Sequence, residues 1–234
     1  MVKNFDDIYA KKGPYHFTLT GFSKHWYYEN YNLIKEFLGN THNKRILDIG
    51  CGDGFLTSQL GTNVLGIDRS GEGLKLAKKL TKNNYLLADM RNLPFKDRSL
   101  DAIVNSVSII YINKDELPSL VKEFKRVLIP KGKAVISFPN IKDLKRRVYV
   151  FLGLESEYRR ETMELAPGEI SLNDLEELFV QEGFRLNEKK GIFVTLPYFC
   201  DRLGKYKPFY NFMTGLAKIL PSLSHTVVYE FTLN

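Results

Sequence analysis

The chain has 234 residues, of which 44% are hydrophobic and 13% aromatic; this is enough apolar surface for a packed core and excludes a disordered protein. Two cysteines, Cys51 and Cys200, and four scattered histidines form neither a disulfide framework nor metal-ligand spacing, so no metal is expected. The formal charge of +7 is compatible with an anionic partner, but basic and acidic residues are mixed along the chain, which favours an ordinary basic surface.

No part of the chain predicts a membrane-spanning segment. The first residues lack the apolar core of a signal peptide, and no uninterrupted apolar run is long enough to cross a bilayer. We therefore expect a cytoplasmic protein with a single domain over residues 1–234.

Residues 1–43 are rich in aromatic side chains and contain one helical pattern. Gly13 and Pro14 interrupt the first part of this segment. Apolar residues then recur at helical spacing over residues 23–37, and Ser23 is expected to cap that helix.

Residues 45–57, reading RILDIGCGDGFLT, predict a buried strand, a glycine turn and the start of a helix. Gly50, Gly52 and Gly54 permit backbone conformations that a Cβ forbids and let a ligand approach the main chain. The turn also leads to free N–H donors at the helix start. A polar ligand is therefore expected across the tip of the strand, and Asp48 at the strand end suits a ligand with an ammonium group.

The spacing of the turn separates two cofactor classes. A dinucleotide fingerprint, G-x-G-x-x-G/A, would place Phe55 at its third glycine position, which speaks against a nicotinamide dehydrogenase. The D-x-G-x-G-x-G pattern instead resembles the class I methyltransferases, which use S-adenosylmethionine and release S-adenosylhomocysteine. In that family the glycine turn runs beside the amino-acid part of the cofactor. A segment before the first strand often folds over the cofactor there, so residues 1–43 form either such an aromatic cap or a cover for one face of the sheet.

Two acidic residues after the turn match further positions of the family. Residues 64–67 predict a second strand that ends at Asp68, and the resemblance implies that this carboxylate accepts hydrogen bonds from both ribose hydroxyls. An isolated surface aspartate is the alternative. Residues 85–87 predict a third strand, after which the resemblance implies that Asp89 bonds the adenine amino group and Met90 packs on the ring. Ser70 is expected to cap the helix between these strands.

The passage ADMRNLPFKDRSLDAIVNS, residues 88–106, resembles one branch of the family that includes quinone, sterol and many small-molecule methyltransferases. A fourth strand is expected over residues 101–106, with its end beside the glycine turn at a topological switch point. Many family members carry a histidine shortly afterwards, where this chain has Tyr111. The catalytic residues therefore stay unknown, and Tyr111, His16 and His25 are the candidates for a general base. The resemblance implies ten cofactor-binding residues: Asp48, Gly50, Cys51, Gly52, Gly54, Asp68, Arg69, Asp89, Met90 and Asn105.

Alternating strands and helices predict an α/β fold with helices on both faces of a parallel sheet. Helices capped at Asn113 and Ser171, a turn at residues 130–133 and strands at 184–194 and 226–233 complete the pattern. The resemblance implies a Rossmann-like, doubly wound, seven-stranded sheet that is mostly parallel with an antiparallel C-terminal strand. We divide the domain into an N-terminal aromatic cap (1–43), a cofactor-binding core (44–140) and two substrate-side insertions (140–170 and 195–225).

Both insertions leave alternatives open. The first has Lys142, Lys145, Arg146 and Arg147 beside an apolar run, which suits phosphate, an anionic membrane or a solvated helix face. The second has aromatic and apolar residues at helical spacing and predicts a core helix, a lid over an apolar substrate or, over 198–222, a peripheral membrane contact.

The function implied is methyl transfer from S-adenosylmethionine to a small-molecule or lipid-like acceptor. An RNA methyltransferase is the alternative that the net charge supports, although no appended RNA-binding module is evident. A catalytically inactive protein that binds the cofactor and acts as a partner is the other alternative. The oligomeric state is not predicted.

Overall fold

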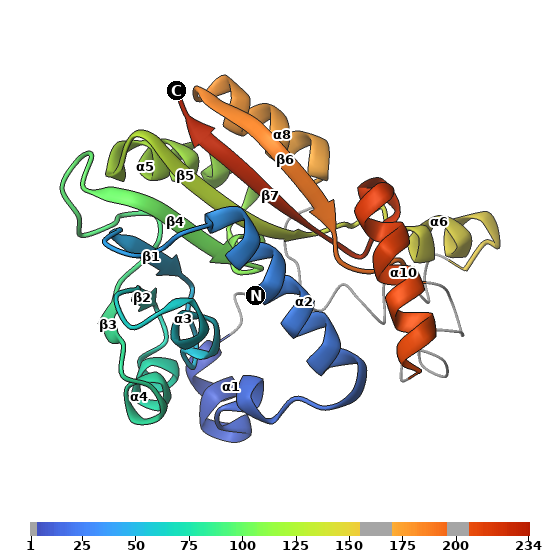
Figure 1. The fold of residues 1–234 in the computed structure, drawn as a ribbon, viewed down its shortest axis with the longest axis horizontal. Coiled ribbons are helices and arrows are strands. Elements are labelled where there is room, and N and C mark those ends of the chain that lie inside the picture. The colour runs from blue at the N-terminus through green and yellow to red at the C-terminus, as the bar shows by residue number, and fades with distance from the viewer. Residues whose placement is uncertain (1–3, 155–169, 196–205) are drawn as a thin grey trace.

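The computed structural model describes residues 4–154, 170–195 and 206–234 (Figure 1). Within these ranges seven strands form one sheet in the order β3-β2-β1-β4-β5-β7-β6. Strands β1 to β5 are parallel, and β7 is antiparallel to both β5 and β6. This confirms the predicted Rossmann-like α/β fold. The strands are β1 (Ile46–Ile49), β2 (Leu65–Asp68), β3 (Asn84–Leu87), β4 (Leu100–Ser106), β5 (Leu128–Pro139), β6 (Phe184–Gly191) and β7 (Thr226–Leu233).

Helices cover both faces of the sheet (Figure 1). Side chains of α5 and α8 pack in one core cluster, and those of α2, α3 and α10 pack in the other. The described helices are α1 (Phe5–Lys12), α2 (Gly21–Leu38), α3 (Phe55–Leu60), α4 (Gly71–Leu80), α5 (Leu117–Val127), α6 (Leu144–Phe151), α8 (Leu172–Gln181) and α10 (Lys207–Ile219).

The alternation of side chains along the strands decides which cluster each residue joins. In β4, Ile103 joins the α5/α8 cluster, whereas Ala102 and Val104 join the α2/α3/α10 cluster. Likewise, in β7, Val227 and Val228 belong to opposite clusters. Because successive strand residues point to opposite faces, continuous apolar runs are needed where both faces are covered.

Most predicted caps are present, but two local predictions are wrong. Only one helix was predicted in residues 1–43, whereas α1 forms a further helix there before α2. Ser70 accepts a hydrogen bond from the Gly73 amide, and capping boxes begin at Asn113 and Ser171. The cap predicted at Ser23 is wrong, because α2 already begins at Gly21 after Thr20. The turn predicted at residues 130–133 falls within the range of β5, where Lys131 has a φ of 64° and the pairing with β4 shifts register.

The order of the strands creates an opening at one edge of the sheet. After β1 the chain builds β2 and β3 on one side, and β4 then returns to the other side of β1. The connections at the carboxyl ends of β1 and β4 therefore diverge, which is where ligands bind in sheets of this kind.

Replacing Leu120 by alanine tests the core beneath α5. Leu120 is fully buried there, and truncation leaves a cavity that costs about 2–5 kcal/mol. We expect a loss of this size in the unfolding free energy from urea denaturation. Lys125→Ala, an exposed change on the same helix, should stay within about 0.5 kcal/mol. Equal effects of the two changes would contradict the packing of this helix.

Candidate functional site

A cavity of about 240 Å³ lies at the carboxyl ends of β1, β2 and β4. The strand ends supply one part of its wall, including Gly50, Asp68 and Ser106. The N-terminal segment supplies the other part, which is almost entirely aromatic. Its lining residues are Phe5, Tyr9, Tyr15, His16, Trp26 and Tyr27.

The glycine turn is held against β2 and packed too closely for side chains. The amides of Gly50 and Cys51 both donate to the Ile67 carbonyl, at 2.8 and 2.9 Å. Gly50 has a φ of 75°, and a Cβ there would overlap the Ser108 side chain. A Cβ at Gly52 would overlap the Tyr9 hydroxyl. Glycine is thus required where the turn borders the cavity.

Asp68 connects the turn, the end of β2 and the start of α4. One carboxylate oxygen accepts from the Gly52 amide at 2.8 Å, and the other accepts from the Ser70 amide at 2.8 Å. Burial raises the pKa of Asp68. A carboxylate oxygen has two acceptor positions, so each oxygen retains capacity for a ligand hydroxyl.

Asp89 lies at the cavity next to Met90 and forms an ion pair with Arg91 at 2.6 Å. The hydrogen bonds from Arg91 lower the pKa of Asp89. Arg91 also pairs with Glu116 at 2.8 Å. The carboxylate that could accept from a ligand amino group is therefore held ionised and in place. Arg91 was not predicted as a partner, although its position two residues after Asp89 was a usable signal.

The predicted site residues divide into two groups by position. Asp48 is 1% exposed, and its carboxylate accepts from the Thr57 hydroxyl at 2.7 Å. Asn105 is fully buried and accepts from the Ile109 amide at 3.0 Å. These two side chains support the turn from behind, so their contact with a cofactor stays a prediction. Gly50, Asp68, Arg69, Asp89 and Met90 line the cavity, whereas Asp48, Cys51, Gly52, Gly54 and Asn105 do not.

The structure brings together a histidine and an aspartate that no sequence pattern had paired. Asp53 is fully buried, and its carboxylate lies 2.8 Å from Nδ1 of His16 and accepts from the His16 amide at 3.1 Å. The ring of His16 lines the cavity. Tyr111 also lines the cavity and packs edge-on against Phe5, whereas His25 lies outside the lining and packs on the ring of Tyr210. Asp53 escaped notice because it occupies a spacer position between two glycines, and its partner lies 37 residues earlier.

The N-terminal segment is fastened over the cavity by polar contacts. The carboxylate of Asp6 in α1 accepts from the Ser70 hydroxyl at 2.7 Å and from the Glu72 amide at 3.0 Å. The ring of Tyr9 packs against Gly73, where a Cβ would lie 3.0 Å from the ring. Both contacts join α1 to the first turn of α4.

This arrangement fits a nucleoside-containing cofactor. The acidic side chains Asp68 and Asp89, the close glycine turn and the apolar Met90 face one cavity. Within the described ranges, no group of three or more histidine, cysteine, aspartate or glutamate side chains is placed to hold a metal ion. The fold and the site define the class: a Rossmann-like domain for a nucleoside cofactor.

Comparisons with known proteins identify the family. Residues 47–136 match the methyltransferase domain. An uncharacterized methyltransferase of Oceanobacillus iheyensis is 31% identical over 143 residues, covering 58% of this chain and 67% of the relative. The ubiquinone biosynthesis O-methyltransferase of Pelagibacter ubique is 32% identical over 136 residues, covering 53% and 55%. The chain belongs to the S-adenosylmethionine-dependent methyltransferase family.

A solved structure supports the same fold over nearly the whole chain. The S-adenosylmethionine-dependent methyltransferase of Thermotoga maritima gives a TM-score of 0.70 at 20% identity, covering 98% of this chain and 99% of that one. The sequence matches are shorter, and the chain spans about half the length of the first curated relatives it matches. The matched family domain runs from β1 into β5 and so includes the strand ends that line the cavity.

Replacing Asp48 by asparagine tests the electrostatics behind the turn. Burial raises the pKa of Asp48 to about 7, so folding favours its protonated form. The unfolded group has a pKa of about 3.9, and stability should therefore fall as pH rises from about 4 to 7. The asparagine side chain keeps an acceptor for Thr57 but carries no charge. We expect the stability of Asp48→Asn relative to wild type to increase by roughly 2–4 kcal/mol between pH 4 and pH 8.

Urea unfolding across this pH range measures the difference. Asp115→Asn, at an exposed position, is the matched control and should show little change with pH. A pH-independent difference for Asp48→Asn would contradict the raised pKa.

Proposed function

We propose that this protein transfers a methyl group from S-adenosylmethionine to a small-molecule or lipid-like acceptor. The proposal rests on one observation: a single cavity has one wall with acidic and glycine residues and another wall that is aromatic. The strand ends supply the acidic and glycine positions suited to the cofactor, and the N-terminal segment supplies aromatic rings. Mostly apolar walls with a few polar groups suit small organic ligands. The ubiquinone-biosynthesis relative supports an acceptor of this kind.

The residues that would hold the cofactor follow from the family positions and the lining of the cavity. Asp68 would accept from the ribose hydroxyls, Asp89 from the adenine amino group, and Met90 would pack on the adenine. When bound, S-adenosylmethionine supplies a methyl group on a positive sulfonium, so the sulfur leaves as a neutral thioether. The chain then has two tasks, which are to align the acceptor and to remove its proton. Alignment alone supplies about 7–11 kcal/mol in favourable cases.

His16 is the best-placed group to take the acceptor proton. Asp53 lies against Nδ1, which favours the tautomer with its proton on that nitrogen and leaves Nε2 as an acceptor. The contact between the carboxylate of Asp53 and the backbone amide of His16 fixes the residue further. A methyl acceptor with an O–H or N–H group would transfer its proton to Nε2 as the new bond to carbon forms.

The proposed cofactor class can be tested by calorimetric titration of the purified protein with S-adenosylmethionine and, separately, NADH. We expect saturable binding of the first alone. Asp68→Ala should weaken that binding about 10- to 100-fold, the range for hydrogen bonds to a charged group. Unchanged affinity would contradict the ribose assignment.

The acceptor class needs a second assay, in which labelled methyl groups are offered to quinone precursors, lipid extracts and RNA. Transfer to RNA alone would favour the alternative acceptor. Cofactor binding without transfer to any of these would favour a binding partner that has lost catalysis.

Replacing His16 by asparagine tests the proton acceptor. With an acceptor in hand, we expect kcat to fall about 10²- to 10⁴-fold, while the dissociation constant of S-adenosylmethionine changes little. His25→Asn is the matched control, since His25 lies on Tyr210 outside the cavity lining. A loss of cofactor affinity that accounts for the whole defect would assign His16 to cofactor binding instead.

A further inference from the structure

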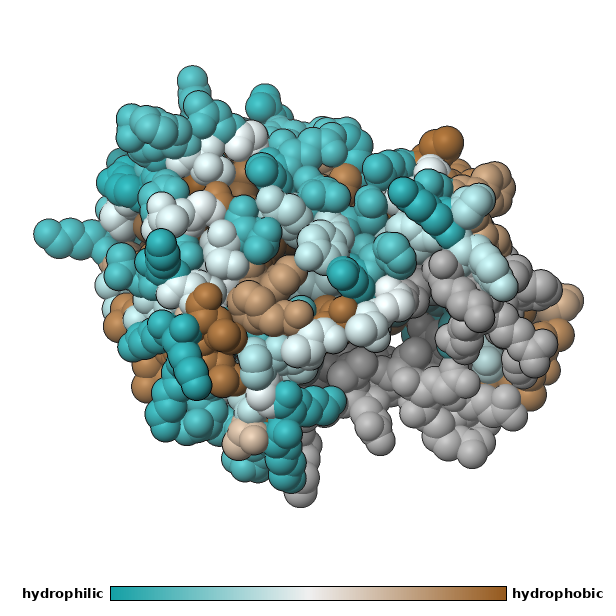
Figure 2. Space-filling model, turned by 60° about the horizontal axis from the view of Figure 1, so that its bottom comes forward, coloured by the Kyte–Doolittle hydropathy of each residue, from teal (hydrophilic) through white to brown (hydrophobic). Residues whose placement is uncertain are grey.

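The end of the molecule that carries α6 and α10 exposes large hydrophobic side chains. Figure 2 shows hydrophobic atoms at the right-hand end, where Figure 1 places these helices. Phe151 is 88% exposed, Ile219 77% and Phe212 68%. We call the following six residues the apolar end: Val150, Phe151, Leu152, Phe212, Ile219 and Leu220. Exposed apolar groups gathered in this way mark interaction surfaces.

Core packing explains only one side of α10. Tyr210, Met213 and Ala217 are buried in the α2/α3/α10 cluster, as expected for a core helix. Phe212 and Ile219 are seven residues apart, so they lie two turns apart on another face of the helix. This second, outward face is apolar as well. The prediction of a core helix is therefore incomplete, because core packing does not explain why these two exposed side chains are apolar.

Helices α6 and α10 themselves carry charged side chains of one sign only. The sequences of α6 and α10, LKRRVYVF and KPFYNFMTGLAKI, contain no aspartate or glutamate. They carry five cationic residues: Lys145, Arg146, Arg147, Lys207 and Lys218. Lys207 and Lys218 are exposed on α10 and lie on the same flank of the helix. Cationic and apolar side chains on one helix surface match the interface of a membrane with anionic headgroups.

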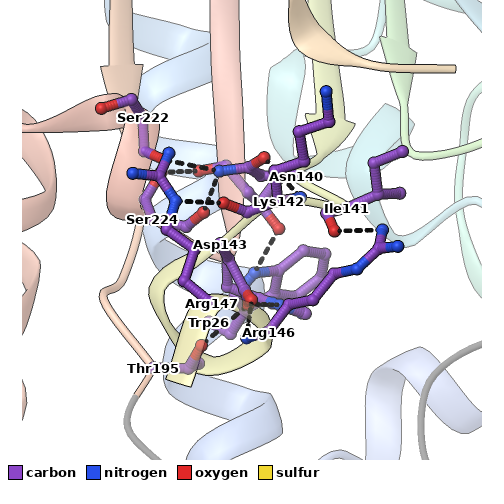
Figure 3. A network of polar contacts seen from close by, with 12 residues as sticks. Trp26, Asn140, Ile141, Lys142, Asp143, Arg146, Arg147, Thr195, Ser222 and Ser224 are labelled. Carbon is purple, nitrogen blue, oxygen red and sulfur yellow. Dashed lines mark hydrogen bonds and ion pairs between the residues drawn. The ribbon is translucent and has the colours of Figure 1, made fainter. Parts of the chain in front are cut away.

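Hydrogen bonds join α6 to the segment that follows α10, so the two parts of the surface are held together. Arg147 donates to the Ser222 carbonyl at 3.1 Å, and Asn140 donates to the carbonyls of Ser222 and Ser224 at 3.0 and 2.9 Å (Figure 3). The buried N-cap of α6, Asp143, accepts from the Thr195 hydroxyl at 2.9 Å (Figure 3).

The same network reaches the wall of the cavity. Trp26 lines the cavity, and its indole N–H donates to the Thr226 hydroxyl at 3.2 Å. The neighbouring His225 lies 3.4 Å from the Asp143 carboxylate at the start of α6. The apolar end is thus joined to the aromatic wall of the cavity by a short chain of contacts.

We propose that α6 and α10 form a docking surface for a phospholipid membrane with anionic headgroups. Phe151, Leu152, Phe212 and Ile219 would enter the headgroup region, and the exposed Lys207 and Lys218 would face the phosphates. Within the described residues, no helix is both long and apolar enough to cross a bilayer, so the contact is peripheral. The surface goes beyond the proposed methyl transfer, and its binding can be measured without any methyl acceptor.

Flotation of the full-length protein with vesicles tests the proposal. One set of vesicles contains phosphatidylcholine alone, and the other contains phosphatidylcholine and phosphatidylglycerol at about 7:3. We expect binding to the second set, weakened when the salt rises from about 0.1 to 0.5 M, because salt screens the charges. The triple change Phe151→Ser, Phe212→Ser and Ile219→Ser should reduce binding at least tenfold.

Two further variants serve as the control and as a second test of vesicle binding. Val180→Ser with Leu80→Ser removes apolar side chains that are 55% and 44% exposed elsewhere on the molecule and should leave vesicle binding unchanged. Lys207→Glu with Lys218→Glu should abolish the preference for anionic vesicles, and it serves if the triple variant misfolds. Equal binding by wild type and both surface variants, or no binding by wild type, overturns the proposal.

Light scattering after gel filtration tests whether a second copy of the chain, instead of a membrane, occupies the surface. A concentration-dependent dimer of wild type that the triple change abolishes, without vesicle binding, would overturn the proposal and assign the surface to a second copy of the chain. Titration with S-adenosylmethionine on the same samples keeps this outcome distinct from a failure of the proposed function, since the surface variants should bind the cofactor as wild type does.

Discussion

The carboxylate of Asp68 is the contact on which the site depends. It binds the amide of Gly52 in the glycine turn and the amide of Ser70 at the start of α4, while its own residue ends β2. This one side chain thereby holds the glycine turn next to the start of α4, and a ligand can span the two only if they stay close. The same carboxylate lines the cavity. A single partly buried acid therefore shapes the backbone of the site, and we propose that it also offers acceptor atoms to the ligand.

The N-terminal segment completes the site by filling the space that glycine leaves. Tyr9 packs over Gly52 and Gly73, and Asp6 bonds the first turn of α4. The aromatic wall is consequently fixed by packing and hydrogen bonds to the glycine turn and α4. Because His16 belongs to this segment and Asp53 to the glycine turn, docking also assembles the pair that we assign to proton removal. In our proposal, cofactor binding and acceptor chemistry therefore both depend on the contact between this segment and the glycine turn.

The two insertions predicted from the sequence form one surface, which the composition of neither insertion indicated. The basic residues of α6 and the aromatic residues of α10 were each compatible with several functions. The hydrogen bond from Arg147 to the Ser222 carbonyl holds these two parts at one end of the molecule, where we propose that their exposed side chains contact a membrane together. The parts of the insertions over residues 155–169 and 196–205, including Cys200, lie outside the described residues.

Local patterns in the sequence determined the strands, the helix caps and the glycine turn, because each depends on residues near one another in the chain. The fold class and the family also followed, since the turn and the passage after Asp89 resemble known proteins. Only the fold decided which predicted residues face the cavity. Asp68 and Asp89 line it, whereas Asp48 and Asn105 lie behind it. The pairing of His16 with Asp53 was likewise invisible, because contacts across 37 residues leave no periodic signal and arise only when packing closes the intervening chain.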